Sequence, residues 1–383
     1  MRNRGLGVRV VHKGRVAVIG LGAAGLSACL TAAELGWSVI GFDRSTVGAD
    51  SAASAGRSKI IRFGYTDPFY AELMRDTLPR WERLERDTGS SLINLCGMLH
   101  FGVGGGSGTN AVIESLERSG QDCEVLAGRE QTSERTGLQL RAGEIGVYER
   151  NAGMMTPASV FQALLARASA LEVTLHENTA VSAIDEDGDS VTVVTSNGPV
   201  TVDRVIIAAG GQFGRFAPTS HINVTRQYQI VCDSAQPVAD GRGCSWMDVT
   251  ADEWYGMVNA GHGIHIMGFH EPATVVDPDQ PIDDAELRQS VAVQLQYLRE
   301  RLALNSRQLT LREVRTCHYT NTASKDFVID RLPGSSTVLL SACSGHGFKF
   351  TITSGHLAAQ LACTDAPPVP RFQLSATSSK AQL

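Results

Sequence analysis

The sequence predicts an α/β fold in which a Rossmann-like nucleotide-binding domain is joined to a second domain built on a mixed β-sheet. Two observations predict the first domain: an apolar run at 16–19 leads through a glycine-rich turn into a helix, and a second apolar run follows at 37–42. A third observation, that strand-like runs dominate from about 224 to 313, predicts the second domain. The length of 383 residues is sufficient for two domains.

The first elements along the chain form a βαβ unit. An apolar strand at Val16–Ile19 is followed by a helix from Ala23 to Leu35, which Gly36 ends as a C′ glycine often does. The next strand is expected at Trp37–Phe42, so that strand, helix and strand together take about 30 residues. This spacing is typical of a mononucleotide-binding half.

Proline after a capping residue predicts two further helices. Asp67 followed by Pro68 indicates the start of a helix that carries Phe69, Leu73, Leu78 and Trp81. Thr156 followed by Pro157 opens a second helix over 158–170. Between them, from about 87 to 149, the pattern loosens around a glycine-rich turn at 102–108.

The remaining elements follow from short apolar runs and turn residues. Strands are expected near 173–175 and 191–194, Asn197-Gly198 is a hairpin turn, and 205–211 is a buried strand that ends in glycines. An amphipathic helix carries one apolar stripe that belongs to the core, at Leu287, Val291, Leu295, Leu298 and Leu302. The last strand, at 338–342, precedes a final helix, and the Pro- and Ser-rich tail after Thr364 is expected to be loose.

Composition excludes several classes of protein. A hydrophobic share of 43% with 39 Gly and 13 Pro is typical of a soluble globular enzyme. The formal net charge of −6, spread without long runs, argues against a nucleic-acid-binding surface and gives no reason to expect an anionic membrane partner. No apolar segment approaches the length of a transmembrane helix. Residues 1–13 are basic but lack an apolar region and a cleavage site, so we expect a short frayed tail. The dispersed cysteines, described next, favour a cytoplasmic protein.

The eight cysteines are dispersed, with no CxxC pair and no Cys/His spacing of the kind that binds zinc. In a chain of this size, that distribution favours reduced thiols over a disulfide framework. No metal site is predicted.

Residues 20–25 read Gly-Leu-Gly-Ala-Ala-Gly, the GxGxxG pattern between an apolar strand and a helix. Gly20 allows the tight turn, Gly22 lets a pyrophosphate approach the backbone, and Gly25 lets helix and strand pack closely. The N-terminus of the helix then presents free N–H groups and its positive dipole end to the phosphates. The pattern alone is weak, but its setting predicts a dinucleotide site.

Asp43 lies 18 residues beyond Gly25, at the end of the second strand, where a carboxylate can hold a ribose hydroxyl pair. Neighbouring Arg44 is consistent with a 2′-phosphate, although an exposed arginine after a strand is the simpler interpretation. The fingerprint leaves NAD and FAD both open.

Three later stretches carry a more specific pattern. They are SAGRSKIIRFGY at 54–65, TCHY at 316–319 and SGHGFKF at 344–350. With them, the chain resembles the family of monomeric sarcosine oxidase and its relatives, the N-methyltryptophan and pipecolate oxidase group of flavin amine oxidases. The resemblance runs from about Val16 to Thr364, and it implies FAD as the cofactor.

The resemblance implies a covalent flavin and a carboxylate site. Cys317 matches the cysteine that links to the flavin 8α-methyl group in this family, whereas an isolated cysteine is more often a small buried hydrophobe. Arg62 and Lys349 match the cationic pair that holds the substrate carboxylate, Arg with a bidentate fork and Lys with a point charge. The alternative for both cations is a solvated surface position, which their apolar sequence context disfavours.

The resemblance also implies which side chains surround the reacting carbon of the substrate. Tyr255, Tyr319 and His270 match residues that line the substrate side of the flavin. Lys349 falls at the start of the last helix, whose N-terminus faces the flavin pyrimidine in the family and stabilises negative charge there. Further cofactor contacts are implied at Ser58, Val181, Gly345 and Gly347.

Two departures from the family pattern concern oxygen. Lys59 stands where the family has a flavin-contacting arginine. A gapless match of residues 254–270 places Ile266 where the family has the lysine that activates dioxygen, and an isoleucine cannot stabilise developing superoxide. A one-residue bulge would place His265 there instead, and Lys59 is another candidate for the missing charge.

The resemblance implies a discontinuous FAD-binding domain at 14–86, 150–218 and 315–370, with a substrate domain at 87–149 and 219–314. The expected reaction is oxidation of the C–N bond of a secondary amine, amino acid or cyclic imino acid that bears a carboxylate. Hydride would pass to the flavin N5, and oxygen would be the acceptor, giving hydrogen peroxide. The protein is expected to be a monomer.

Three alternatives stay open at this point. The first is a dehydrogenase of similar substrates with another electron carrier, for which Ile266 argues. The second is a nicotinamide-dependent reductase, and the third is a flavin-binding protein without turnover. The side chain of the substrate is also open.

Overall fold

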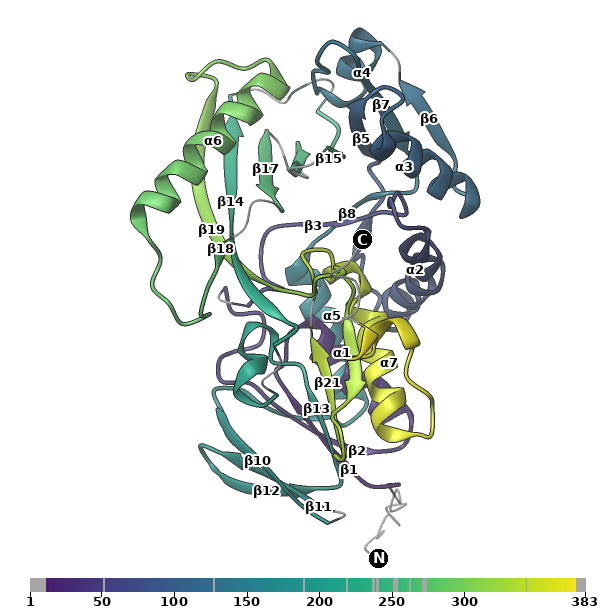
Figure 1. Cartoon of the computed structure of the whole chain (residues 1–383), viewed down its shortest axis with the longest axis vertical. Coiled ribbons are helices and arrows are strands. Elements are labelled where there is room, and N and C mark those ends of the chain that lie inside the picture. The colour runs from purple at the N-terminus through teal and green to yellow at the C-terminus, as the bar shows by residue number, and fades with distance from the viewer. Residues whose placement is uncertain are drawn as a thin grey trace, which may run out of the picture.

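The computed structural model describes residues 12–376 apart from 51, 127, 189, 218–219, 236–237, 239–240, 251–253, 262, 271–273 and 342. Most of the N-terminal tail and the last seven residues therefore lie outside the described part of the chain. The molecule is elongated, with one sheet system in each half and the helices α1, α5 and α7 beside the lower one (Figure 1). The predicted α/β class is confirmed.

A six-stranded sheet forms the lower half, in the order β20-β21-β13-β1-β2-β9. All neighbours are parallel except the edge pair β20–β21. The strands are β1 (Arg15–Ile19), β2 (Ser38–Phe42), β9 (Thr174–His176), β13 (Arg204–Ile207), β20 (Val328–Arg331) and β21 (Thr337–Ser341).

Both faces of this sheet are covered, which explains the unbroken apolar runs of its strands. Val16 and Val18 of β1 join the core under the helices, whereas Ala17 and Ile19 point to the other face. That second face is covered by the antiparallel sheet of β10 (Val181–Asp187), β11 (Ser190–Thr195) and β12 (Gly198–Val202).

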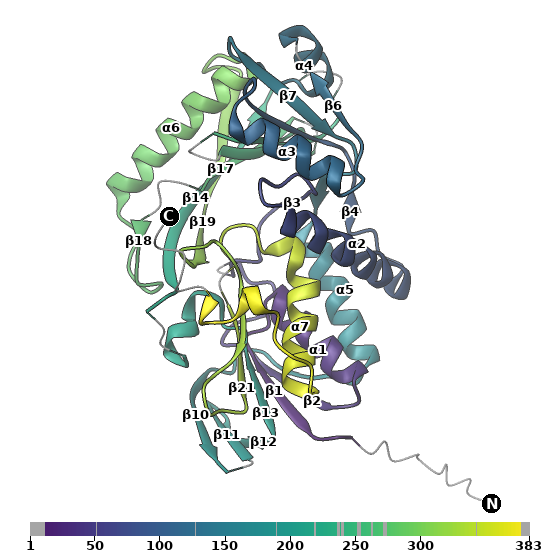
Figure 2. The same cartoon turned by 45° about the vertical axis from the view of Figure 1, so that its right-hand side comes forward.

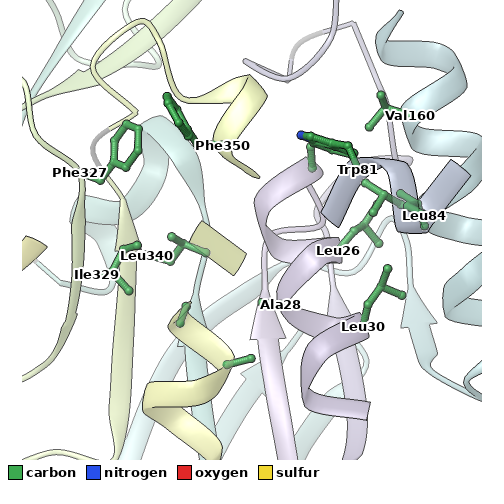
Figure 3. Close-up of a cluster of buried hydrophobic side chains, with 14 of the residues drawn as sticks. Leu26, Ala28, Leu30, Trp81, Leu84, Val160, Phe327, Ile329, Leu340 and Phe350 are labelled. Atoms are coloured by element: carbon green, nitrogen blue, oxygen red, sulfur yellow. The ribbon is translucent and has the colours of Figure 1, made fainter. Parts of the chain in front are cut away.

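The helices of the lower half are α1 (Ala23–Glu34), α2 (Pro68–Thr88), α5 (Pro157–Ala170) and α7 (Thr351–Cys363). The starts predicted for α1, α2 and α5 are confirmed, and the Asp67 side chain accepts a hydrogen bond from the Phe69 N–H at 3.0 Å. Helices α1 and α7 run side by side (Figure 2). Leu26 and Leu30 of α1 meet Leu84 of α2 and Val160 of α5 in one apolar cluster (Figure 3).

A nine-stranded mixed sheet forms the upper half, as predicted for the second domain. Its order is β18-β14-β17-β16-β15-β5-β7-β6, and β19 also pairs with β14; the pair β15–β5 is parallel and the others are antiparallel. The strands are β5 (Met98–Val103), β6 (Cys123–Leu126), β7 (Glu144–Glu149), β14 (Asn223–Ser234), β15 (Cys244–Asp248), β16 (Trp254–Val258), β17 (Ile264–Phe269), β18 (Thr274–Val275) and β19 (Leu309–Asn321).

Helices α3 (Ser107–Arg118), α4 (Arg129–Thr136) and α6 (Asp284–Leu302) accompany this sheet. The predicted apolar stripe of α6 is core mainly at its C-terminal end, where Leu298 and Leu302 are buried against the sheet. A small sheet of β3 (Lys59–Ile61), β8 (Gly153–Met155) and β4 (Ile93–Asn94) lies between the two halves. Two of the predicted domain limits, 86/87 and 314/315, fall inside the continuous elements α2 and β19.

The expectation of a loose tail after Thr364 is wrong for residues 365–376. Phe372, in the short 3₁₀ turn η3 (Pro370–Phe372), is fully buried against Phe69 and Phe327. Arg371 pairs with Asp67 and, at 2.6 Å, with Asp326. One aromatic anchor and one arginine therefore hold a segment whose composition alone indicated a loop.

Candidate active site

A cavity of about 470 Å³ lies between the two large sheets. Its lower wall is formed where strands of the six-stranded sheet end, at Gly20, Asp43, Ala208 and Ser341. Its upper wall comes from the nine-stranded sheet, at Gln229, Met247, Tyr255, Met257, Cys317 and Tyr319. Ligands of open α/β sheets bind beyond the carboxyl ends of the strands, which is where this cavity lies.

The glycine turn fits a pyrophosphate. Gly20 has φ +96°, and a Cβ on Gly25 would lie 1.9 Å from the Gly20 carbonyl oxygen, so neither position accepts a side chain. Gly22, the N-cap of α1, lines the cavity and brings no side-chain cap, and a Cβ there would meet only the Ser54 hydroxyl at 3.4 Å. The backbone at the N-terminus of α1 is therefore open toward the cavity.

Asp43 and Arg44 lie at the same end of the cavity. One Asp43 carboxylate oxygen accepts from the Leu21 N–H at 2.8 Å and the other from the Ser45 N–H at 2.9 Å. Arg44 is exposed and lies 3.9 Å from Asp279, which suits the simpler interpretation of a surface arginine. Val181 begins β10 and lines the cavity with Thr179 and Ala180.

Cys317 lines the cavity from β19, near Lys59 and a second thiol, Cys343. Burial raises the pKa of the Cys317 thiol to about 11, although the Lys59 ammonium opposes this shift. Burial lowers the pKa of Lys59, whose Nζ donates to the Ala53 carbonyl at 3.1 Å. All eight cysteines are free.

Arg62 and Lys349 both line the cavity, are 8% and 4% exposed, and contact the same residue, Tyr65. Arg62 donates to the Gly64 carbonyl, and its guanidinium lies 4.1 Å from the centre of the Tyr65 ring. Lys349 Nζ donates to the Tyr65 hydroxyl at 2.8 Å and to the His346 carbonyl at 2.9 Å. Burial and the charge of Arg62 lower the pKa of Lys349 well below its usual range.

Neither cation forms an ion pair with a carboxylate among the residues that the structure describes. Buried charges are ordinarily paired, so these two call for an anion in the cavity. Lys349 lies in the 3₁₀ turn η2 (Phe348–Phe350), directly before α7.

Three rings form one wall of the cavity. The Tyr255 and Tyr319 hydroxyls are 3.0 Å apart, and the His270 ring stacks on Tyr255 with centroids 4.6 Å apart. Burial, with Arg62 and Lys349 nearby, lowers the pKa of His270 to about 3, so this imidazole is neutral. Burial raises the pKa of both phenols above the usual value.

The other expected cofactor contacts also line the cavity. Ser58 is buried, with its hydroxyl 3.5 Å from the Met155 carbonyl oxygen. Gly345 lies against Tyr319 and His270, and Gly347 lies against Cys343. The structure thus brings the three motif stretches into one site.

His265 is not part of this site. The β16–β17 and β14–β17 registers continue without a bulge, so Ile266 keeps the position expected from the gapless match. Ile266 is fully buried beside Met257 and Met154. His265 points to the opposite face, where its Nε2 lies 3.0 Å from the Ser234 hydroxyl. The gapless alternative therefore holds and the alternative of a bulge is wrong, because regular strand pairing fixes the face on which each side chain lies.

The sequence reasoning missed several lining residues. Tyr65, which contacts both cations but is not among the residues that line the cavity, lies inside a motif stretch and received no role. Of the lining residues, Met257 follows Tyr255 by two residues on one strand face, a signal that alternation could have given. The others carried no recognisable signal: Gln229, Met247, Arg315 and Cys343.

Among the described residues, no helix has the length and apolar character needed to cross a membrane.

Comparisons with known proteins agree with this geometry. Residues 15–361 match the family model for FAD dependent oxidoreductase. Monomeric sarcosine oxidase of Bacillus sp. (strain NS-129) is 26% identical over 367 residues, covering 91% of this chain and 92% of that protein. N-methyl-L-tryptophan oxidase of Citrobacter koseri is 24% identical, covering 91% of this chain and 95% of that protein.

Solved structures share the fold. NikD, described as an unusual amino acid oxidase essential for nikkomycin biosynthesis, superposes with a TM-score of 0.82 at 22% identity, over 95% of this chain and 98% of that chain. L-proline dehydrogenase from P. horikoshii superposes with a TM-score of 0.80 at 18% identity, over 94% of this chain and 97% of that chain.

Proposed function

Because the chain belongs to the FAD-dependent oxidoreductase family and is an enzyme of the sarcosine oxidase type, we propose that it oxidises the C–N bond of a small carboxylate-bearing amine. Secondary amines, amino acids and cyclic imino acids share this chemistry. The observation that carries the proposal is the pair of buried cations, Arg62 and Lys349, which have no carboxylate partner among the described residues. A substrate carboxylate would supply the missing anion.

The residues around the cavity fit FAD. The Gly20–Gly25 turn and the open N-terminus of α1 would hold the pyrophosphate, and Asp43 would hold the ribose. When bound, FAD would supply the two-electron acceptor for the C–N bond. We place its covalent attachment at Cys317, which the Lys59 ammonium helps to ionise.

Within the cavity, charge would prepare the substrate for oxidation. Arg62 and Lys349 would hold the carboxylate and thereby position the reacting carbon. Their two positive charges, together with a neutral His270, disfavour an ammonium group, so the amine binds in its deprotonated form. Tyr255 and Tyr319 would bound the space beside it.

Part of the cavity wall is apolar. Met247 and Met257 are 6% and 1% exposed, Ile60 is half-buried, and all three line the cavity. Such a wall favours a hydrophobic group on the substrate, because a polar group placed there would lose its hydrogen bonds to water. We therefore propose substrates larger and more apolar than sarcosine.

The test is anaerobic. The flavin-loaded protein would be mixed with a panel of N-methyl amino acids and cyclic imino acids, from sarcosine to N-methyl derivatives with aliphatic or aromatic side chains. Bleaching of the flavin absorbance, faster with the apolar members, is the expected result. A flavin that none of them bleaches would indicate a flavin-binding protein without turnover. The match to the FAD dependent oxidoreductase family argues against the nicotinamide-dependent reductase.

We propose oxygen as the electron acceptor, giving hydrogen peroxide, with Lys59 as the nearby cation that would stabilise superoxide. The second candidate is a dehydrogenase that passes its electrons to another carrier, and Ile266 favours it because an isoleucine cannot stabilise superoxide. The test photoreduces the flavin without air and then admits oxygen. Reoxidation within the mixing time supports the oxidase, and reoxidation over minutes supports the dehydrogenase with another electron carrier.

We also propose that the enzyme acts as a monomer. Light scattering of the loaded protein tests this.

A further inference from the structure

A buried carboxylate and imidazole lie directly behind the two cations. Glu149 ends β7, and His100 lies on the neighbouring strand β5. Their side chains are fully buried, and His100 Nε2 lies 2.9 Å from Glu149 Oε2. Neither residue lines the cavity among the described lining residues, so neither touches a ligand there.

The Glu149 carboxylate holds the backbone of the segment that carries Arg62. Its Oε1 accepts from the Phe63 N–H at 2.6 Å, and its Oε2 accepts from the Gly64 N–H at 3.0 Å. Arg62 donates back to the Gly64 carbonyl. The segment 62–65 is therefore fixed at two successive N–H groups by one carboxylate.

The same segment also positions the second cation. Tyr65 stacks on the Arg62 guanidinium, and its hydroxyl accepts a hydrogen bond from Lys349 at 2.8 Å. Moving this segment would therefore move Arg62 and would also displace the hydroxyl that accepts from Lys349.

Charge gives Glu149 a second effect. Burial lowers the pKa of His100, so the imidazole is neutral and donates its Nε2 proton to the carboxylate. The Glu149 charge raises the pKa of Lys349 against the opposing effects of burial and Arg62. Glu149 forms no ion pair with Arg62 or Lys349 among the described residues, so a substrate carboxylate would still be the anion in direct contact with both cations.

We propose that Glu149, oriented by His100, is the positioning residue for the substrate carboxylate site formed by Arg62 and Lys349. It sets the affinity for the carboxylate without contacting the substrate. This inference rests on the proposed function of these two cations.

The test measures binding rather than turnover. The flavin-loaded protein is titrated with cyclopentanecarboxylate, an apolar acid without an amine, and with cyclopentanecarboxamide as its neutral twin; the flavin spectrum reports occupancy. In Glu149→Gln, the neutral amide no longer accepts from both N–H groups and the negative charge is lost. We expect the acid to bind about tenfold or more weakly, because the segment that carries Arg62 loses its anchor and the strong charge-assisted hydrogen bonds to the acid lose their geometry. Unchanged or tighter binding would show that the lost negative charge matters more than positioning, and would overturn the inference. The affinity for the amide should change less than about twofold.

Two variants separate positioning from general stability. Asp248→Asn is the matched control: Asp248 is an equally buried carboxylate that accepts from Tyr297 and Arg301 on the far side of β15. It should lower the melting temperature and leave acid binding unchanged. In the double variant Arg62→Met/Glu149→Gln, the second change should add little to the loss from the first, because the two residues act on one ligand group.

The outcomes distinguish the two proposals. If Arg62→Met weakens acid binding and Glu149→Gln does not, the positioning role is wrong and the proposed function stands. If Arg62→Met has no effect, the carboxylate site itself is wrong. Should Glu149→Gln not fold, His100→Gln keeps the carboxylate and changes its donor; it should weaken acid binding about threefold, and unchanged binding overturns the inference.

Discussion

Arg62 is the single residue on which the proposed chemistry depends most. Arg62→Met keeps the volume of the side chain but removes its charge and its hydrogen bonds. We expect KM for a carboxylate substrate to rise by about tenfold to a hundredfold, since a hydrogen bond to a charged group contributes about 1.5–3 kcal/mol. Steady-state kinetics measures this. Arg57→Met, an exposed arginine of the same segment that pairs with Glu313, is the control and should leave KM unchanged.

Two thiols, Cys317 and Cys343, line the cavity, so replacing each sulfur with oxygen tests which of them binds the flavin covalently. Cys317→Ser should release the flavin into the supernatant on acid precipitation, because a hydroxyl is a far weaker nucleophile than a thiol. Cys343→Ser, which changes the other lining thiol, should keep the colour in the pellet. The opposite pattern would assign the linkage to Cys343.

For single residues, the sequence predicted those whose role depends on neighbours a few positions away in the chain. The glycine turn, Asp43 and the three motif stretches could be predicted because their roles depend on short spacings. Glu149 and His100 could not, because 49 residues separate them and only the pairing of β5 with β7 brings them together. The sequence left Ile266 and His265 as alternatives for one position, because a shift of one residue reverses the face of a strand and only the observed pairing decides between them.

Helices α1 and α7 approach closely at one glycine, and this contact supports the N-terminus of α1. A Cβ on Gly355 would lie 2.5 Å from the Ala24 carbonyl oxygen and 2.6 Å from the Ala28 nitrogen, both backbone atoms of α1. Gly355→Ala is therefore expected to destabilise the fold by about 1–3 kcal/mol, as overpacking does. Urea unfolding measures this. Gly214→Ala, where nothing lies within 4 Å, is the matched control and should change stability by less than about 0.5 kcal/mol.

Elements with strong local signals were predictable. The starts of α2 and α5 follow from Asp67-Pro68 and Thr156-Pro157, and the central strands follow from their apolar runs. The segment 87–149 gave no clear pattern, although it holds α3, α4 and four strands. Its short strands are stabilised by pairing with distant β15 and by burial beneath α3, which no local window contains.

For the whole molecule, buried histidines predict a loss of stability in acid. Burial lowers the pKa of His265 from 6.5 to about 4. Between those values the unfolded chain binds a proton that the folded protein does not, so stability falls as the pH drops through this window. The slope is at most about 1.4 kcal/mol per pH unit for one histidine.

His265→Gln should remove this part of the pH dependence. Urea unfolding of the variant and the wild type across the same window measures the difference. The exposed His221 provides the control, because His221→Gln should leave the slope as it is in the wild type. Identical slopes in all three proteins would show that His265 titrates equally in both states.

The indole of Trp81 is fully buried in the apolar cluster (Figure 3). Its Nε1 donates to the Lys349 carbonyl at 2.7 Å. Tryptophan emission overlaps the near-ultraviolet absorption of an oxidised flavin. Because Trp81 is hydrogen-bonded to Lys349, which lines the cavity, its indole would transfer excitation energy to bound FAD. The fluorescence of Trp81 would therefore report whether FAD is bound. The part of the fluorescence quenching that is lost in Trp81→Phe would follow the binding of FAD during refolding, and this measurement needs no substrate.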